Sequence, residues 1–351
     1  MVRYHFLDNL LPDNQRTRDR LAREADAASG AVFDLLASIG GDVAGGLVLT
    51  STDTPPSPTD DPLVPFTDDD LAYRVATLRE DPDRWLDRDI RGGRFSLAGT
   101  QAKFAMASVD GRWYQPSPTI PSTHIVKPSS TRLPEADAVE AATMSLARLV
   151  GIPTPDTTIL RVLGQRAFMT ERFDRDATTT PATRVHGEDL AQAAGMAGGK
   201  KYGMTAKQAI QLLHRHDPTD ALGHQFVERL AFAVASGNCD AHAKNYTLLL
   251  HPGGVALAPA YDQVTTLFWP DFDSTLAMAV GGTTRSAEVT SAHWAKLART
   301  SGLPEDQVVG TARTISAQVT QAAEQAAVGL DPPLRPRFLA AIATANRGMA
   351  A

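Results

Sequence analysis

The stretch from residue 237 to 262 constrains the fold more than any other, because it places two carboxylates and an amide around one hairpin. An apolar helical run ends at a glycine that can cap the helix in a left-handed conformation. Two apolar runs follow, 246–250 and 255–260, separated by a Pro-Gly-Gly turn, and they predict a pair of strands. We therefore expect Asp240 and Asp262 to lie near the ends of strands in one small hairpin.

The spacing of these polar residues indicates phosphoryl transfer. Asp240 and Asn245 match the D-x-x-x-x-N pattern of a kinase catalytic loop, and Asp262 takes the place of the aspartate that opens a D-F-G triplet. Transfer from magnesium-bound ATP needs a carboxylate for the hydroxyl proton and oxygen ligands for the metal. Asn238-Cys239 and Gln263-Val264 depart from the kinase consensus. The alternative is that these are ordinary polar residues of a loop and a turn.

Composition excludes several other classes of protein. The chain has 351 residues, enough for two or three domains, and its net charge of -6 argues against a broad nucleic-acid-binding surface. No apolar run approaches the roughly 18 residues that span a bilayer. Asp8 interrupts the apolar stretch that a secretory signal peptide would need. The single cysteine, Cys239, cannot form an intrachain disulfide. These features predict a cytoplasmic protein without membrane contact.

The first 93 residues predict helices around a linker. A helix capped by Asp13 or Asn14 and a second helix at 32–39 precede a short strand at 44–49. Residues 51–70 are rich in proline and aspartate and predict an extended linker, and 71–88 predict a helix.

From residue 94 the pattern changes to strands. Small residues from Ala98 to Lys103 form a loop before a strand that turns at Asp110-Gly111, and such a loop lets backbone N–H groups approach phosphate oxygens. Lys127 ends another strand, where it could pair with ATP phosphates or simply reach solvent. The helix at 134–149 carries Glu135 and Glu140, and we expect Glu140 to hold Lys127.

Two further strands, 157–163 and 166–170, lead to Glu171-Arg172-Phe173 at a boundary between a β-rich and a helical part. Phe173 could pack on a nucleotide base or belong to the core. The rest of the chain predicts helices at 190–194, 206–214, 221–236, 292–300, 305–327 and 336–347.

Taken together, these pieces resemble the HipA family of serine/threonine kinases, the toxins of type II toxin–antitoxin modules. The resemblance spans about residues 94 to 262 and rests on these segments in order: 95–103 (FSLAGTQAK), 125–128 (IVKP), 171–175 (ERFDR), 186–189 (HGED), 237–245 (GNCDAHAKN) and 261–262 (YD). The start of the chain, 6–13, is also similar to that family. HipA-like chains usually carry a β-rich stretch before this segment.

The resemblance implies an α+β, two-lobed protein-kinase-like fold with a β-rich N-lobe and a mostly helical C-lobe. The implied domains are a partial HipA N-terminal subdomain (1–50), the linker (51–70), the N-lobe with the nucleotide loop (71–175) and the helical C-lobe (176–351). ATP and Mg²⁺ are the implied cofactors.

The resemblance also implies roles for single residues. Asp240 would be the catalytic base, and Asn245 and Asp262 would bind Mg²⁺. Ser96 matches a serine that family members autophosphorylate, a change that adds about -1.5 to -2 charge beside the ATP phosphates and inactivates the enzyme. The implied nucleotide contacts are Ala98, Gly99, Thr100, Gln101, Ala102, Lys103, Lys127, Glu171, Arg172, Phe173, His242, Asn245, Tyr261 and Asp262.

The implied partners are a protein substrate, for which an aminoacyl-tRNA synthetase is the family precedent, and a small HipB-like antitoxin. DNA would be contacted only through that antitoxin. Two alternatives remain: a small-molecule kinase with the same constellation, and a catalytically silent ATP-binding component of a repressor complex.

Overall fold

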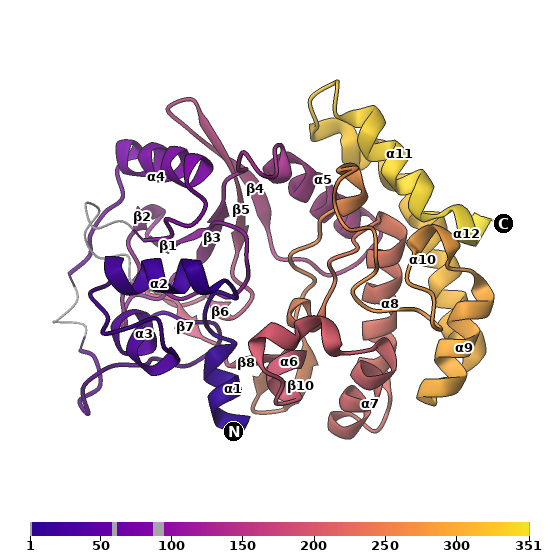
Figure 1. Ribbon diagram of the computed structural model, residues 1–351, viewed down its shortest axis with the longest axis horizontal. Helices are drawn as coiled ribbons and strands as arrows, with labels where there is room; N and C mark the ends of the chain where they lie inside the picture. The colour runs from indigo at the N-terminus through magenta and orange to yellow at the C-terminus, as the bar shows by residue number, and fades with distance from the viewer. Residues whose placement is uncertain (1, 58–61, 87–94, 351) are drawn as a thin grey trace.

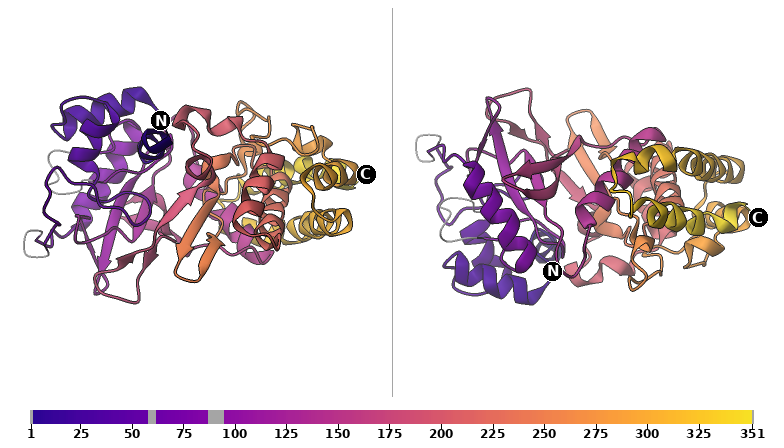
Figure 2. Two further views of the ribbon diagram at one scale, coloured as in Figure 1. Left: turned by 90° about the horizontal axis from the view of Figure 1, so that it is seen from below. Right: turned by 90° about the horizontal axis from the view of Figure 1, so that it is seen from above.

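The computed structural model describes residues 2–57, 62–86 and 95–350, and it has two lobes side by side along its longest axis (Figure 1). The N-terminal lobe contains the larger sheet, and the C-terminal lobe is mostly helical. The views from below and above keep this order, with the C-terminus at the far end of the helical lobe (Figure 2). The expected α+β class, with a β-rich N-lobe and a helical C-lobe, is confirmed.

Most of the predicted helices are present. Asn14 caps the second helix by accepting a hydrogen bond from the N–H of Arg16, and Gly237 ends α8 in the left-handed conformation, with φ of 71°. The α-helices are α1 (Val2–Asp8), α2 (Gln15–Glu24), α3 (Val32–Ile39), α4 (Asp68–Glu80), α5 (Ala136–Leu149), α6 (Leu190–Ala193), α7 (Ala206–His216), α8 (Ala221–Ser236), α9 (Ser291–Ser301), α10 (Glu305–Ala326), α11 (Arg335–Ala345) and α12 (Arg347–Ala350).

The strands form three antiparallel sheets. The largest has the order β2-β1-β3-β5-β4, and the predicted turn at Asp110-Gly111 joins its first two strands. The hairpin β9–β10 lies between the two aspartates, as expected, and β8 adds a third strand. The strands are β1 (Phe104–Val109), β2 (Arg112–Tyr114), β3 (His124–Lys127), β4 (Thr157–Val162), β5 (Gln165–Glu171), β6 (Arg175–Asp176), β7 (Thr183–Arg184), β8 (Gly187–Asp189), β9 (Thr247–His251) and β10 (Gly254–Leu257).

Each lobe has its own apolar core. In the N-lobe, α2, α3 and α4 cover the large sheet, with Trp85 and Phe104 fully buried between them. In the C-lobe, Phe232 and Trp294 lie in a core to which α5, α8 and α10 contribute. The segment that carries Asp240 and Asn245 therefore follows directly on a buried helix, α8. No described helix is long and apolar enough to span a bilayer.

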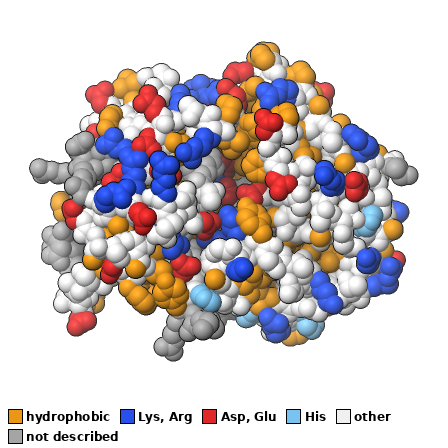
Figure 3. Space-filling view, viewed as in Figure 1, with side chains coloured by type: hydrophobic (Ala, Val, Ile, Leu, Met, Phe, Trp, Pro, Cys, Tyr) orange, Lys and Arg blue, Asp and Glu red, His pale blue; other side chains and the backbone are white. Residues whose placement is uncertain are grey.

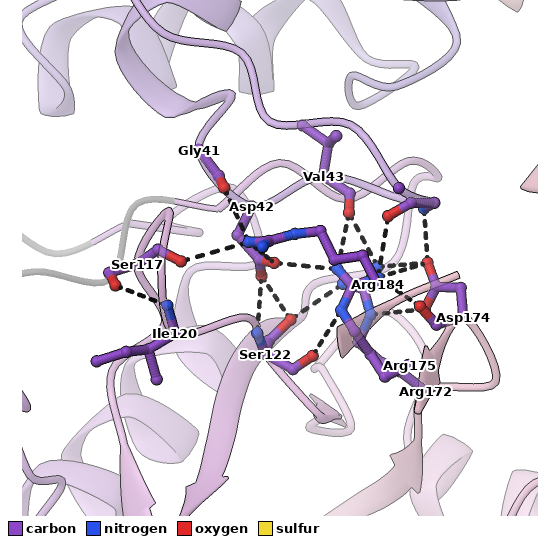
Figure 4. A network of polar contacts seen from close by, with 12 residues as sticks. Gly41, Asp42, Val43, Ser117, Ile120, Ser122, Arg172, Asp174, Arg175 and Arg184 are labelled. Carbon is purple, nitrogen blue, oxygen red and sulfur yellow. Dashed lines mark hydrogen bonds and ion pairs between the residues drawn. The ribbon is translucent and has the colours of Figure 1, made fainter. Parts of the chain in front are cut away.

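The chain after α3 is joined to the sheet by a buried network of charges (Figure 4). Arg175 Nη2 lies 3.0 Å from Asp42 Oδ1, and Arg172 Nη2 lies 2.7 Å from Asp174 Oδ2. Asp174 Oδ2 also accepts the backbone N–H of Gly45, at 2.7 Å. These two arginines and two aspartates are almost inaccessible to water, and a third arginine, Arg184, lies 3.4 Å from Asp42 at the edge of the network. Such a network is stable only when every member has its partner.

The strand predicted at 44–49 is wrong. The N–H of Gly45 binds Asp174, and the N–H of Gly46 donates to His186 Nδ1 at 3.3 Å, so these groups do not pair with another strand. Gly45 also has a φ of 76°, which a regular strand does not permit. The apolar pattern reflected partial burial rather than strand pairing.

The linker prediction is wrong at its acidic end. Thr67 caps α4 in a reciprocal capping box with Asp70, so Asp68–Asp70 form the first turn of a helix, where negative charge is favourable. Positions 58–61 of the predicted linker lie outside the described residues. The helix expected at 71–88 ends at Glu80, and its positions 87–88 also lie outside the described residues.

The buried network predicts a large stability effect for Asp42→Asn. The substitution removes the carboxylate charge that Arg175 and Arg184 share and leaves Asp174 as the remaining carboxylate partner of Arg175. Removing one member of a buried ion pair costs about 3–5 kcal/mol. We expect this loss in the free energy of unfolding, measured by urea denaturation followed by circular dichroism. Asp69→Asn, at an exposed position in α4, is the matched control and should change stability by less than about 0.5 kcal/mol. Equal stabilities of the two variants would contradict the role of the network.

Candidate active site

A cavity of about 370 Å³ lies between the two lobes. The face drawn in Figure 3 is hollowed between the two halves, and charged side chains gather in that hollow. Ala102 was expected to contact the nucleotide, but its side chain packs in the N-lobe core and does not line the cavity. The expected residues that do line it are Ala98, Gly99, Thr100, Gln101, Lys103, Lys127, Glu171, Arg172, Phe173, Asp240, His242, Asn245, Tyr261 and Asp262.

Lys127, at the end of β3, is the charged centre of this cavity. Its Nζ lies 2.6 Å from Glu140 Oε1 on α5 and 2.6 Å from Asp262 Oδ1 beyond β10. The expected pairing with Glu140 is confirmed, whereas Glu135 pairs with Arg166, at 2.5 Å. One ammonium group thus joins elements of both lobes.

Burial and neighbouring charges shift the pKa values of the groups in this cluster in opposite directions. Burial disfavours the charge on Lys127, but Asp262 and Glu140 outweigh it and raise the pKa of the ammonium. Burial likewise disfavours the charge on Asp262, but Lys127 and Lys103 outweigh it and lower the pKa of that carboxyl. For Glu140 burial dominates, and its pKa is raised despite Lys127. Lys127 and Asp262 therefore keep their charges at neutral pH.

Asn245 and Asp262 lie together at one side of the cavity. Asn245 Nδ2 donates to Asp262 Oδ2 at 2.9 Å, and Asn245 Oδ1 accepts the backbone N–H of His242 at 3.1 Å. Asp262 has a φ of 55°, an uncommon left-handed conformation that aims its side chain back toward the catalytic segment. Mg²⁺ in kinases is usually held by one or two carboxylates together with substrate phosphates. This donor set fits such an ion, and no described group of three or more His, Cys, Asp or Glu residues forms a larger metal site.

Asp240 lies on the loop between α8 and β9, facing the same cavity. Its Oδ1 accepts a hydrogen bond from the Tyr202 hydroxyl at 2.7 Å. Burial raises the pKa of the Asp240 carboxyl, an effect that the Tyr202 hydrogen bond and Lys201 partly oppose. Its neighbour Cys239 is buried, and burial raises the pKa of this thiol to about 11, so it is not a thiolate nucleophile at neutral pH.

A hydrogen bond from Lys103 stabilises the conformation of the small-residue loop, 98–103. Lys103 Nζ donates to the carbonyl of Ala98 at 2.8 Å, and Gly99 between them has a φ of 106° that favours glycine. Burial, and then the charge of Lys127, lower the pKa of Lys103 to about 8. Ser96 lies behind this loop rather than in the cavity: its hydroxyl donates to the carbonyl of Leu10 at 2.8 Å and is almost inaccessible.

The remaining expected contacts lie at the edge of the cavity next to β5. The ring of Phe173 packs on that of Tyr261, with centroids 4.7 Å apart. The guanidinium of Arg172 is held in the buried network, so its side chain is not free to contact a ligand. His242 is buried, and burial lowers its pKa to about 3, which leaves it neutral.

Comparisons with known proteins agree with this geometry. A family model described as the HipA-like C-terminal domain matches residues 95–326, and one described as the HipA N-terminal domain matches residues 3–50. The chain belongs to the HipA family. The resemblance that we inferred from the sequence motifs is thus confirmed.

Relatives within the HipA family are kinases by name. The chain is 32% identical to the putative kinase Y4mE of Sinorhizobium fredii, over 85% of this chain and 72% of that protein. It is 28% identical to the serine/threonine-protein kinase toxin HipA of Shewanella oneidensis, over 93% of this chain and 78% of that protein. The structure of a Shewanella oneidensis HipA, in a complex with HipB and operator DNA, superposes with a TM-score of 0.81 at 25% identity, covering 97% of this chain and 85% of that one. The fold and the enzyme class are therefore those of a HipA-like serine/threonine kinase.

Some residues of the HipA-like cavity had no signal in the sequence. Asp13 lies 2.9 Å from Lys201 and 2.8 Å from Lys244, and Tyr202 binds Asp240. The two pairs of Asp13 join the N-terminal segment to the C-lobe over more than half the length of the chain, whereas Tyr202 and Asp240 both lie in the C-lobe. No local pattern marks these contacts. Lys201 and Tyr202 lie on a short 3₁₀-helix, Gly198–Gly203, in a segment for which no element was predicted.

The charge cluster predicts a pH-dependent stability defect for Lys127→Met. Without the ammonium, burial and the charge of Asp262 act on Glu140, opposed only by the charge of Lys103, and raise its folded-state pKa further above the ordinary 4.5. A carboxyl whose pKa is higher in the folded than in the unfolded state does not reduce stability below its unfolded-state pKa. Its ionisation reduces the free energy of unfolding as the pH rises through its folded-state pKa. We expect a deficit in unfolding free energy of about 3 kcal/mol at pH 8 that becomes smaller at pH 5.

Two comparisons make this measurement specific. Lys127→Met combined with Glu140→Gln should recover most of the loss in unfolding free energy at pH 8, because position 140 then carries no charge. Lys207→Met, at an exposed position in α7, should show no pH-dependent deficit. A deficit that is equal at both pH values would contradict the assignment to Glu140.

Proposed function

We propose that this chain transfers the γ-phosphate of ATP to a serine or threonine hydroxyl of a protein. The observation that carries the proposal is the convergence of Asp240, Asn245, Asp262 and Lys127 on one cavity between the lobes. A base, an amide and a carboxylate for the metal, and a phosphate-binding cation are the parts that kinase chemistry requires.

The nucleotide would lie across this cavity from β5 to the small-residue loop. The backbone of Glu171–Phe173 would contact the adenine, with the paired rings of Phe173 and Tyr261 as an apolar wall and His242 nearby. The loop from Ala98 to Lys103 would lie along the phosphates. Lys127 and Lys103 supply the positive charge that the phosphates need, and a bound anion would keep Lys103 protonated.

Asn245 and Asp262 would hold Mg²⁺, which supplies charge stabilisation to the transferring phosphoryl group. Asp262 is already ionised beside Lys127, and each of its oxygens keeps a lone pair besides the hydrogen bond that it accepts. Lys127 could then release Asp262 and turn toward the phosphates while it keeps Glu140.

Asp240 would act as the general base. It would accept the proton of the acceptor hydroxyl as that oxygen forms a bond to the γ-phosphorus, and the bond from phosphorus to the ADP oxygen would break. Burial raises the pKa of this carboxyl, which makes the carboxylate a better proton acceptor.

The partners follow from the relatives. The Shewanella oneidensis neighbour is a toxin in a complex with HipB and operator DNA, which supports a HipB-like antitoxin here and DNA contact only through it. The protein acceptor would be of the aminoacyl-tRNA synthetase kind implied by the family. The proposed domains are 1–50 (N-terminal subdomain), 51–70 (linker, which the start of α4 shortens), 71–175 (N-lobe) and 176–351 (C-lobe). Within 71–175, α5 packs in the core of the C-lobe.

Asp240→Asn tests the mechanism. We expect phosphate transfer from Mg-ATP to protein to fall by about 10²–10⁴-fold, because the base is lost, while the affinity for Mg-ATP is retained. The measurement uses radiolabelled ATP with bacterial lysate, separated into protein and small-molecule fractions. Asp306→Asn, at an exposed position at the start of α10, should keep full activity. Label only in metabolites would favour the small-molecule kinase, and full activity of Asp240→Asn would refute the base.

Ser96 gives a second test. Because its hydroxyl is buried against Leu10, phosphorylation requires the loop to leave its site, and the added charge would then prevent its return. We expect mass spectrometry of the protein incubated with Mg-ATP to find phosphate on Ser96, and none in the Asp240→Asn variant. An unmodified Ser96 after complete turnover of the added ATP would contradict this assignment.

A further inference from the structure

Tyr202 lies beside the base without any role assigned so far. Its hydroxyl donates to Asp240 Oδ1 at 2.7 Å, and its ring packs edge-on against the imidazole of His242 with centroids 5.2 Å apart. The residue is 55% exposed at the mouth of the cavity, so no core packing requires it there. Its position is therefore set by these two contacts with the catalytic loop.

The hydrogen bond from Tyr202 is the one that the Asp240 carboxylate accepts within the described part of the chain. The other oxygen, Oδ2, accepts no hydrogen bond from the described residues, and Asp240 is only partly buried in the lining of the cavity. A general base works best when a third group fixes its orientation and leaves one lone pair toward the reacting proton. The carboxylate of Asp240 has this arrangement, with Oδ1 anchored and Oδ2 available.

We propose that Tyr202 is a positioning residue for phosphoryl transfer: its hydroxyl anchors Oδ1 of Asp240 so that Oδ2 faces the incoming acceptor hydroxyl. This inference rests on the proposed function, since it assumes that Asp240 is the base. Tyr202 would touch neither the nucleotide nor the reacting atoms.

The segment that carries Tyr202 is fixed by the N-terminal part of the chain. Lys201 Nζ lies 2.9 Å from Asp13 Oδ2, and the N–H of Gly198 donates to Asp8 Oδ2 at 3.3 Å. Asp13 also pairs with Lys244 of the catalytic loop, at 2.8 Å. The Asp13 carboxylate thus pairs with the neighbour of Tyr202 and with a lysine of the loop that carries Asp240. These two ion pairs preorganise the base before an acceptor binds.

Tyr202 remains a donor under working conditions. Partial burial, and then the charge of Asp240, raise the pKa of the phenol, so it does not compete as a base or nucleophile. The other charged groups that act on Asp240 are Lys201, Asp262 and Asp13, and none of them changes when Tyr202 becomes phenylalanine.

Tyr202→Phe tests the inference, with Tyr73→Phe on α4 as the matched exposed control. The probe is Mg-ATP with dephosphorylated casein, together with label incorporated into the enzyme itself. We expect kcat to fall about tenfold in Tyr202→Phe, the size of one lost hydrogen bond to a charged group, with the KM for ATP within about twofold. The acid limb of kcat/KM should move to higher pH, because the carboxylate loses a donor that stabilises its ionised form. Tyr73→Phe should match the unmodified protein.

A second measurement does not depend on activity. The carbon-13 carboxyl signal of Asp240, assigned by its loss in Asp240→Asn, should titrate at higher pH in Tyr202→Phe than in Tyr73→Phe. Unchanged titration and an unchanged acid limb would overturn the inference, even if kcat falls, because a merely structural effect would remain. Absence of phosphate transfer by the unmodified protein to casein, itself or lysate protein would instead refute the proposed function, and the titration would still decide the Tyr202 contact.

Discussion

The ammonium of Lys127 is the interaction on which the rest of the structure depends. It is buried where β3 ends, and a buried cation is costly unless carboxylates meet it. Glu140 comes from α5 and Asp262 from the segment beyond β10, so the requirement to neutralise one charge brings three elements to one point. The cluster therefore connects the two lobes at one wall of the cavity. In the function that we propose, the same cation would also bind the phosphates of ATP, so that stability and ligand binding would depend on one group.

A second constraint works at the edge of the cavity. Arg172 and Arg175 flank Phe173 in sequence, and both are held by aspartates and carbonyl groups in the buried network. Their neighbour is thereby fixed, with its ring against Tyr261. The side chains of Arg172 and Arg175 therefore stabilise the wall of the cavity and are not free to contact a ligand. The network thus anchors the backbone on both sides of Phe173.

Much of the site could be predicted from sequence, because kinase chemistry fixes residue types at short spacing. Asp240 and Asn245 are five positions apart, and the hairpin after them returns the chain to Asp262. The pairing of Lys127 with Glu140 followed from a strand and the next helix. Helices such as α3 and α8 were found at their observed bounds because their apolar positions repeat with the helical period.

The predictions that differ from the structure failed for a different physical reason. The strand expected at 44–49 failed because a distant carboxylate, Asp174, takes the backbone N–H that a strand would use. Ala102 faces the core although its neighbours face the cavity. Asp42 and Arg175 contact each other across 133 positions, one in the part matched by the HipA N-terminal model and one in the part matched by the C-terminal model. A chimaera that exchanges the N-terminal segment with that of a relative would therefore keep this buried ion pair only if the incoming segment carries an acid at the position of Asp42.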